Sequence, residues 1–496
     1  MRFKQTLSGV GVLLLAFPIT FAVPFIVGLL YNEPMIDLLR SYLLPAGYSF
    51  SLGLFMTSFG GWSPRHKLDL RASEALGVVA VSWLVIAGIG ALPFVLMGTL
   101  PNYIDAYFES MSGFTTTGAS VITQIDGLEH SILIWRSMTQ WLGGLGVIVL
   151  MVALFSIILS GPKAGMLLMK GEVPGHKNDK IVHRIKDTAK ILWGLYVIFS
   201  VAEVVLLTIL GLSLFDAVCH TFTTLSTGGY GTHTTSITHY SDMGTAPFIE
   251  GVITLFMFIG GTNFVLHYNF LAKGIKSYLK DPEFRVYLAV MAGLWFVVTF
   301  DLIINNIYDP LESVRNAVFT VTSIQTTTGY VTGDYSTWPA FSRFIILVAM
   351  FIGGMTGSTG GGMKIARFII VYKGVRRSLK RLGHPKSTLP VRVMDVILEE
   401  KIVRGVGLFI FAYLSIFLVS SFVISLTGPD AISSIAAVAA TLGNVGPGLG
   451  LVGPTSNYAS IHYSAKVILS LLMWFGRLEI FTCLIFLNPA IYKRRY

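Results

Sequence analysis

Four short segments of this chain end in nearly the same way, and each closes on a glycine. They read FTTTG at 114–118, TLSTG at 224–228, QTTTG at 325–329 and LGNVG at 442–446. The glycines lie roughly 100 to 120 residues apart, which is too long for a solenoid repeat and suits two membrane helices with a re-entrant segment between them. The sequence therefore predicts four copies of one pore loop in a single polypeptide.

A second mark recurs in the apolar segment that follows each loop. The chain reads WLGG at 141–144, FIGG at 258–261, FIGG at 351–354 and WFGR at 474–477. Two marks that recur in the same order argue against coincidence. They predict an all-α polytopic membrane protein with four pseudo-symmetric helix, pore-loop and helix repeats around a central pore. The repeats are expected at residues 71–162, 187–280, 283–375 and 395–496, after an amino-terminal two-helix region at residues 1–70.

Composition agrees with a membrane location. The chain is 53% hydrophobic and only 12% charged, with a mean hydropathy of +0.70, which excludes a soluble globule with an ordinary polar surface. The first apolar run is longer than the hydrophobic part of a signal peptide and no cleavage site follows it, so we expect it to be retained. Segments near the ~20 apolar residues that a bilayer requires predict ten spans, at about 8–30, 40–60, 75–99, 133–160, 188–211, 246–272, 285–307, 341–371, 403–427 and 463–489.

Basic residues gather in alternate loops of this topology. The basic groups lie at 65–71, 163–186, 273–280, 373–404 and 493–495, whereas the intervening loops carry mainly acidic residues. The positive-inside rule then places both termini in the cytoplasm, and every pore loop enters from outside. This topology explains the net charge of +10, so no nucleic-acid binding is predicted. The group at 373–404 suits a cytoplasmic partner or anionic lipid, and the sequence does not choose between them.

The segment before each loop glycine is too short to span a bilayer. Its helix dipole directs the carbonyl end toward the membrane centre, where a cation is favoured. Beyond the helix, exposed carbonyls are tolerated only if they are buried in protein or line a water-filled path, and glycine permits the backbone angles required. Four such loops predict a ring of backbone oxygens that replaces the hydration shell of a monovalent cation. The predicted filter residues are Thr116, Thr117, Gly118, Ser226, Thr227, Gly228, Thr327, Thr328, Gly329, Asn444, Val445 and Gly446.

The segment 351–364, FIGGMTGSTGGGMK, places six glycines where the inner helix of the third repeat is expected. Each interior glycine costs about 1 kcal/mol relative to alanine, so the helix should be broken there. The alternative is a close-packing patch of small residues. Arg477 interrupts another apolar segment, and we expect it to contact a carbonyl of the glycine-rich segment; the alternative is snorkelling to the inner interface.

Several other polar residues have modest interpretations. Glu203 lies mid-span, where a structural role is favoured over a proton relay. Glu109 and His220 lie in or near the pore helices and are expected to brace the loops. Lys364 and Arg367 are interpreted as interfacial anchors in preference to pore-lining residues. The sequence groups no other metal-ligating residues with the histidines at 220 and 233. The two cysteines suggest neither a disulfide nor a metal site.

These loops and glycines resemble the potassium-translocating subunit of the bacterial Trk/Ktr/HKT superfamily, over residues 70–490, and the extra amino-terminal helix pair is similar to the Trk branch. The resemblance implies potassium uptake across the bacterial inner (plasma) membrane, a fourfold pseudo-symmetric pore, a homodimer and a cytoplasmic nucleotide-binding regulatory subunit, a TrkA-like ring. The fourth loop departs from the threonine-rich pattern, as the family's fourth repeat does. The resemblance also implies a gate, carried over to Gly353, Gly354, Gly357, Gly360, Gly361, Gly362 and Arg477.

Two other classes remain as alternatives. A proton- or sodium-coupled secondary carrier would also have repeats and broken helices, but four equivalent filter loops have no role in it. An intramembrane enzyme is disfavoured, because no nucleophile, base or metal constellation is evident. The segments 448–453 and 357–364 imitate a dinucleotide fingerprint and a phosphate loop without the required context. We therefore expect K⁺ as the transported ion, no organic cofactor and no enzymatic activity.

Overall fold

The computed structural model describes residues 3–61, 72–158, 179–383, 389–393, 396–480 and 482–483. Within these residues the protein is almost entirely helical, and its one sheet is an antiparallel pair of two-residue strands, β1 (Arg392–Val393) and β2 (Val396–Ile397). Five of the described helices are long and apolar enough to cross a membrane, and a sixth span results if one bent helix pair counts as one. The chain is thus a multi-pass membrane protein. The basic groups predicted at 65–71 and 493–495, and most of the one at 163–186, lie outside the described residues.

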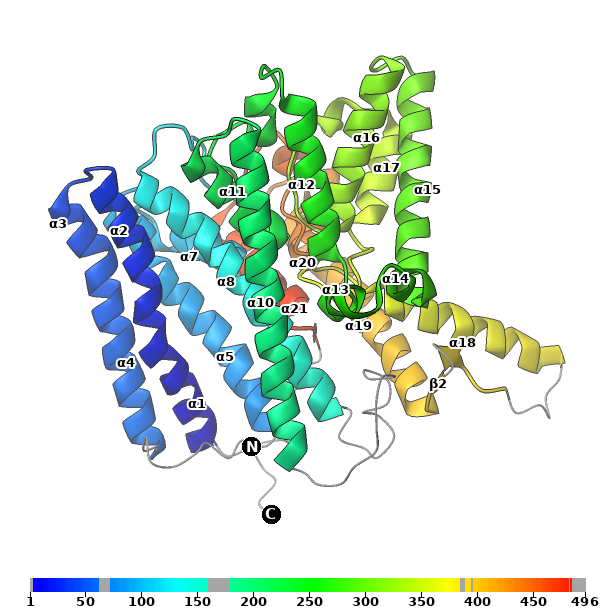
Figure 1. The fold of residues 1–496 in the computed structure, drawn as a ribbon, viewed down its shortest axis with the longest axis horizontal. Helices are drawn as coiled ribbons and strands as arrows, with labels where there is room; N and C mark the ends of the chain where they lie inside the picture. Colours follow the sequence, from blue (N-terminus) through cyan, green and yellow to red (C-terminus); the bar gives the residue numbers. More distant parts are fainter. Residues whose placement is uncertain are drawn as a thin grey trace.

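Two antiparallel spans form the amino-terminal region. The first runs through α1 (Phe3–Ala16), η1 (Phe17–Phe21) and α2 (Ala22–Leu30), and the second through α3 (Met35–Leu38), η2 (Leu39–Leu43) and α4 (Leu44–Gly60). Helix α1 packs against α4, and the two lie side by side at one edge of the molecule (Figure 1). A Cβ at Gly11 would lie 2.9 Å from the carbonyl oxygen of Gly53, so small residues allow the close approach that is typical of membrane helix pairs.

The rest of the chain alternates long helices with short ones that end inside the protein. The long helices that precede the loops are α5 (Ala72–Gly90) with α6 (Leu92–Leu96), α10 (Asp179–Ile209), α15 (Pro282–Ile304) and α19 (Glu400–Ser425). The short helices are α7 (Tyr103–Phe114), α11 (Leu214–Leu225), α16 (Pro310–Gln325) and α20 (Ala431–Leu442). Each short helix follows a residue suited to an N-cap: Asn102, Ser213, Asp309 or Asp430.

The helices that follow the loops differ from one another. Helix α8 (His130–Ile158) is continuous, and α21 (Tyr463–Arg477) ends at Arg477. The predicted span 246–272 is instead two helices, α12 (Ala246–Gly261) and α13 (Phe264–Lys273), bent by 100°. Asn263 begins the second helix by accepting a hydrogen bond from the Val265 amide at 2.9 Å, so a new N-cap explains the break that hydropathy does not reveal.

The third of these segments is interrupted, as its glycines predict. Helix α17 (Ala340–Ala349) ends early, and α18 (Ile365–Gly383) begins only after the glycine-rich segment and extends away from the bundle (Figure 1). The predicted span 341–371 is therefore not a single helix. The remaining short elements are η3 (Ser236–Tyr240), α14 (Lys276–Lys280), η4 (Tyr335–Thr337) and η5 (Gly450–Val452).

Helix contacts link the four parts of the chain in a circle, in which α18 and α19 join the third part to the fourth. Helix α8 packs against α7 and α11, and α12 packs against α11 and α16. Helix α21, near the end of the chain, packs against both α20 and α7. Each of α8, α12 and α21 therefore contacts the short helix before its own loop and also the next short helix around the circle. For α21 that next short helix is α7, the first in the chain.

Candidate ion pore and gate

The four short helices end in the same backbone motif. A residue in the left-handed region follows each helix, with φ of 50° at Thr116, 55° at Thr227, 64° at Thr327 and 54° at Asn444. The next residue returns its amide to a carbonyl of the last helical turn, for example from Thr117 to Ser112 at 2.8 Å. This is the Schellman arrangement, which normally uses glycine or asparagine at the left-handed position. Threonine is β-branched and resists that conformation, so three of the four loops hold a strained residue in the same place.

A second left-handed residue follows two positions later in every loop. These residues are Gly118, Gly229, Gly329 and Gly446, with φ of 81°, 78°, 83° and 98°. In the second loop the equivalent glycine is thus Gly229, and Gly228 takes the place of Thr117. The predicted register of that loop, with Gly228 as its filter glycine, is one residue early. Two adjacent glycines made the sequence ambiguous, and backbone geometry resolves it.

The four glycines fit against one another in a closed circle. A Cβ at Gly118 would lie 2.1 Å from the carbonyl oxygen of Gly228, and one at Gly229 would lie 1.9 Å from that of Thr328. The same contact joins Gly329 to Val445 at 2.1 Å and Gly446 to Thr117 at 2.6 Å. Each loop therefore presents a glycine to the carbonyl of the next loop, and the fourth loop returns to the first.

A cavity of about 130 Å³ opens on one side of this circle. Its lining includes Gly118, Gly229, Gly329 and Gly446, together with residues that follow each loop. Four segments from distant parts of the sequence thus share one mouth.

Buried hydrogen bonds hold the loops in place. Glu109 and Arg136 form a buried ion pair at 2.9 Å, and Glu109 also accepts the Val121 amide at 2.9 Å beyond the first loop. Arg136 donates to the carbonyl of Gly231 at 3.0 Å, beyond the second loop. This agrees with the bracing role predicted for Glu109. Arg136 was missed, although a charged residue inside the predicted span 133–160 is a signal that could have found it.

Amide side chains connect neighbouring loops. The Gln140 amide donates to the carbonyl of Gly228 at 2.8 Å and accepts the Tyr230 amide at 3.1 Å. Asn444 Nδ2 donates to the hydroxyl of Thr117 at 3.0 Å, which joins the fourth loop to the first. The role of Gln140 was not predicted, because its carbonyl partner lies 88 positions away in the chain.

His220 also joins two loops. Its ring nitrogens lie 3.1 Å from the hydroxyls of Tyr330 and Tyr240. It therefore braces the second loop against the third, as predicted. Glu203 is fully buried on α10.

The glycine-rich segment lies directly against the loops and the ends of their short helices. The Thr359 hydroxyl donates to the carbonyls of Leu225 and Gly260, both at 2.9 Å. The Gly361 amide donates to the hydroxyl of Thr327 at 2.6 Å, and the Gly362 amide donates to the Gly443 carbonyl at 2.8 Å. One segment of the chain is thus bonded to the second, third and fourth loops or their helices.

Arg477 connects this segment to the remaining part of the circle. Its guanidinium is buried and donates to the carbonyl of Thr359 at 2.6 Å and to that of Gly143 at 3.3 Å. The predicted contact with a carbonyl of the glycine-rich segment is confirmed. Snorkelling to the interface is excluded, because the side chain is only 3% exposed.

The two basic residues after the glycine-rich segment differ in position. Lys364 is buried and its ammonium donates to the carbonyl of Gly360, so its interpretation as an interfacial anchor is wrong. Arg367 pairs with Glu479 and lies over the ring of Phe409, with its guanidinium carbon 3.8 Å from the ring centroid. Glu283 was missed: it accepts the amide of Thr356 within the segment at 2.7 Å and that of Ala366 just after it at 3.2 Å.

The second sequence mark has a packing role. A Cβ at Gly143 would lie 2.3 Å from the carbonyl of Phe114, and one at Gly476 would lie 2.2 Å from that of Leu442. Gly260 approaches the carbonyl of Leu225 in the same way, at 3.0 Å. In each case the missing side chain lets the end of a short helix rest on the helix that follows its loop.

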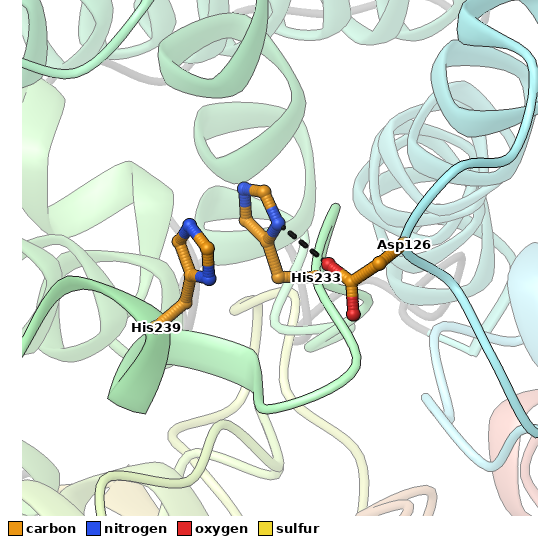
Figure 2. Close-up of side chains that lie close together, drawn as sticks. All are labelled: Asp126, His233 and His239. Atoms are coloured by element: carbon orange, nitrogen blue, oxygen red, sulfur yellow. Dashed lines mark hydrogen bonds and ion pairs between the residues drawn. The ribbon is translucent and has the colours of Figure 1, made fainter.

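Asp126, His233 and His239 form a cluster of metal-binding residue types (Figure 2), and His233 also lines the cavity at the mouth. His233 Nδ1 lies 2.9 Å from a carboxylate oxygen of Asp126, and the His239 ring stacks on that of His233 with centroids 3.5 Å apart. Hydrogen bonds from Thr234 and His233 lower the pKa of Asp126 to about 2. The nearby carboxylate of Asp216 raises the pKa of His233. The prediction that His233 lacks metal-ligand company is wrong, because its companions come from the loop before α8 and from η3.

Comparison with known proteins identifies the family. A family model named TrkH, described as a cation transport protein, matches residues 50–491. The chain belongs to the TrkH family. The TrkH-family chain is 39% identical over 503 residues to the Trk system potassium uptake protein TrkH of Salmonella typhimurium, covering 99% of this chain and 100% of that relative.

A more divergent relative and a solved structure agree. The Trk system potassium uptake protein TrkH of Halomonas elongata is 36% identical over 499 residues and is covered in full. The crystal structure of the potassium transporter TrkH from Vibrio parahaemolyticus superimposes with a TM-score of 0.88 at 34% identity, over 99% of this chain and 100% of that one. The TrkH-type fold therefore extends over nearly the whole chain.

Proposed function

We propose that this chain takes up K⁺ across the bacterial inner membrane through a channel-like pore at the centre of the four loops. One observation carries the proposal: the glycine of each loop faces the carbonyl of the next in a closed circle of four. The four repeats are those expected at residues 71–162, 187–280, 283–375 and 395–496, and residues 1–70 are an accessory pair. The names of the potassium uptake relatives support K⁺ as the transported ion.

The selective element is the backbone. Carbonyl oxygens of the filter residues replace the hydration shell of K⁺, and the partial negative charge at the ends of four helix dipoles favours a cation there. The side chains at the loop ends are hydroxyls, an amide and valine, so no fixed carboxylate binds the ion. The hydrogen bonds of Gln140 and Asn444 support the loops at a fixed spacing.

The gate is the glycine-rich segment with Gly353, Gly354, Gly357, Gly360, Gly361 and Gly362. Its amides and the Thr359 hydroxyl bond to the undersides of three loops, which would obstruct an ion leaving the filter. Arg477 holds the segment by its contact with Thr359. Opening requires this segment to exchange those bonds for others, and the missing side chains leave it room to do so.

The membrane orientation and partners follow from charge. Both termini are proposed to be cytoplasmic, so the cavity lined by the loop glycines faces outward. Helix α18 carries exposed basic residues at 376, 380 and 381, which suit either a cytoplasmic nucleotide-binding subunit or anionic lipid. The protein is proposed to act as a homodimer with such a TrkA-like subunit and without an organic cofactor.

Ion flux into liposomes that contain the purified protein tests this function. We expect downhill K⁺ flux that exceeds Na⁺ flux and needs no gradient of a second ion. Flux that requires a proton or sodium gradient, and that shows counter-transport, would instead indicate a carrier.

A further inference from the structure

The cluster of Asp126 and the two histidines combines donors that transition metals prefer. Asp126, His233 and His239 each offer one ligand atom, and these three atoms lie within 4.8 Å of one another. One carboxylate oxygen and two imidazole nitrogens form a borderline donor set that favours Zn²⁺ over Mg²⁺ or Ca²⁺. Three protein ligands also leave a fourth position for water, as in open zinc sites.

A second carboxylate completes the surroundings. His233 lies between two acids, since its Nδ1 contacts Asp126 at 2.9 Å and its Nε2 is 3.8 Å from Asp216. Metal-bound histidines usually donate their other ring N–H to a carboxylate, which fixes the ring and strengthens the bond. An ion between His233 Nδ1 and Asp126 would leave Asp216 in that position.

The cluster can adjust to an ion at small cost. The His233 and His239 rings are parallel within 5°, so one ring must turn before both nitrogens point at one centre. His239 and Asp126 are exposed, and rotation of an exposed side chain is rapid. Zinc–nitrogen bonds of about 2.0–2.1 Å would then draw the three ligands together.

We propose that Asp126, His233 and His239 form a Zn²⁺ site at the outer mouth, and that occupancy inhibits K⁺ entry. Asp126 follows the first loop, whereas both histidines follow the second, so the ion would tie two mouth segments together. His233 also lines the cavity that contains the four loop glycines. A divalent cation beside this cavity would repel an incoming K⁺. The inhibitory effect rests on the proposed pore, whereas the binding site does not.

Zinc binding is measured first, by calorimetry on the purified full-length protein with Zn²⁺ alone as the probe. We expect one ion per chain and no comparable binding of Mg²⁺. His239→Ala and Asp126→Asn should each weaken Zn²⁺ binding by roughly 100-fold, and Asp216→Asn by about 10-fold. The matched control is His462→Asn, an exposed histidine outside the cluster whose N-cap role asparagine preserves. Equal zinc affinity in His239→Ala and in the unaltered protein would overturn the site.

Potassium flux into liposomes is then measured with and without external Zn²⁺. We expect zinc to reduce flux in the unaltered protein and in His462→Asn but not in His239→Ala. Zinc binding that leaves K⁺ flux unchanged would overturn the inhibition. Flux without zinc is the separate test of the pore itself, so the failure of one proposal is distinguishable from the failure of the other.

Discussion

The loop ends and the helices that follow them differ in regularity. The four loops share two left-handed residues at the same spacing, the same returning hydrogen bond and the same glycine-to-carbonyl contact. The four following helices share only their glycine mark: α8 is continuous, α12 and α13 are bent by 100°, α17 is interrupted and α21 ends at Arg477. The loop half of the proposed pore is nearly symmetric, and the half formed by the following helices is not.

In the proposed pore, this difference separates two tasks, ion coordination and gating. A carbonyl ring must present equivalent oxygens, so all four loops have to keep one geometry. A gate needs an element that can exchange one set of contacts for another, and a single polypeptide can vary one repeat without altering the others. We therefore expect substitutions that disturb the loop geometry to reduce K⁺ flux and substitutions that weaken the contacts of the glycine-rich segment to increase it.

The largest effect is expected from Gly229→Ala. Its new Cβ would lie 1.9 Å from the carbonyl of Thr328, and its φ of 78° is unfavourable for alanine. We expect K⁺ uptake to be lost when measured in potassium-limited growth of an uptake-deficient bacterium.

Two controls sharpen this test. Gly251→Ala, where nothing lies within 4 Å, should grow normally. Gly228→Ala should be less severe than Gly229→Ala, because the atoms nearest its Cβ belong to the side chain of Gln140 rather than to backbone. The reverse order of severity would contradict the register assigned to the second loop.

A smaller effect of opposite sign is expected from Arg477→Gln. Losing the hydrogen bond from a charged group to Thr359 weakens the closed arrangement by about 1.5 to 3 kcal/mol, so K⁺ flux into liposomes should rise roughly tenfold or more. Arg285→Gln, on an exposed position of α15, is the control and should leave flux unchanged. A fall in flux with retained folding would count against Arg477 as a latch.

A matched pair of substitutions compares two equivalent loop positions, one that contacts the glycine-rich segment and one that does not. Thr327 accepts the Gly361 amide at 2.6 Å, whereas the hydroxyl of Thr116 has no partner among the described residues. Valine keeps the β-branch and the backbone strain at both sites. We expect Thr327→Val to raise flux several-fold, on the order of 1 kcal/mol, and Thr116→Val to change little. Equal effects would show that the contact with the glycine-rich segment does not matter.

The smallest effect is expected from Glu283→Gln. The glutamine oxygen can still accept the amides of Thr356 and Ala366, but without a full charge the bonds are about half as strong. Flux should rise about twofold, and Glu312→Gln, an exposed acid on α16, should have no effect. A change as large as that of Arg477→Gln would assign the main latch to Glu283.

Local patterns predicted much of this architecture. The loop sequences and glycine marks predicted the four short helices before the loops, and the glycines at 353–362 predicted the break after α17. The cost of burying Arg477 predicted its carbonyl partner. Family membership is likewise confirmed by the comparisons.

Features that depend on backbone angles or distant partners were not predictable. Adjacent glycines hid the register of the second loop, and continuous hydropathy hid the 100° bend before Phe264. Gln140 contacts the carbonyl of Gly228, which lies 88 positions away in the chain. Lys364 was wrongly predicted to lie at the membrane interface, because the Gly360 carbonyl that it contacts comes within reach only when the glycine-rich segment folds back.

The most direct test of the central claim is to locate a heavy monovalent cation in crystals of the protein. Tl⁺ substitutes for K⁺ and scatters anomalously. We predict an anomalous peak at the centre of the circle, within coordination distance of the carbonyl oxygens of Thr117, Gly228, Thr328 and Val445. Peaks confined to other positions, with none among these four carbonyls, would contradict the assignment of the loops as the filter.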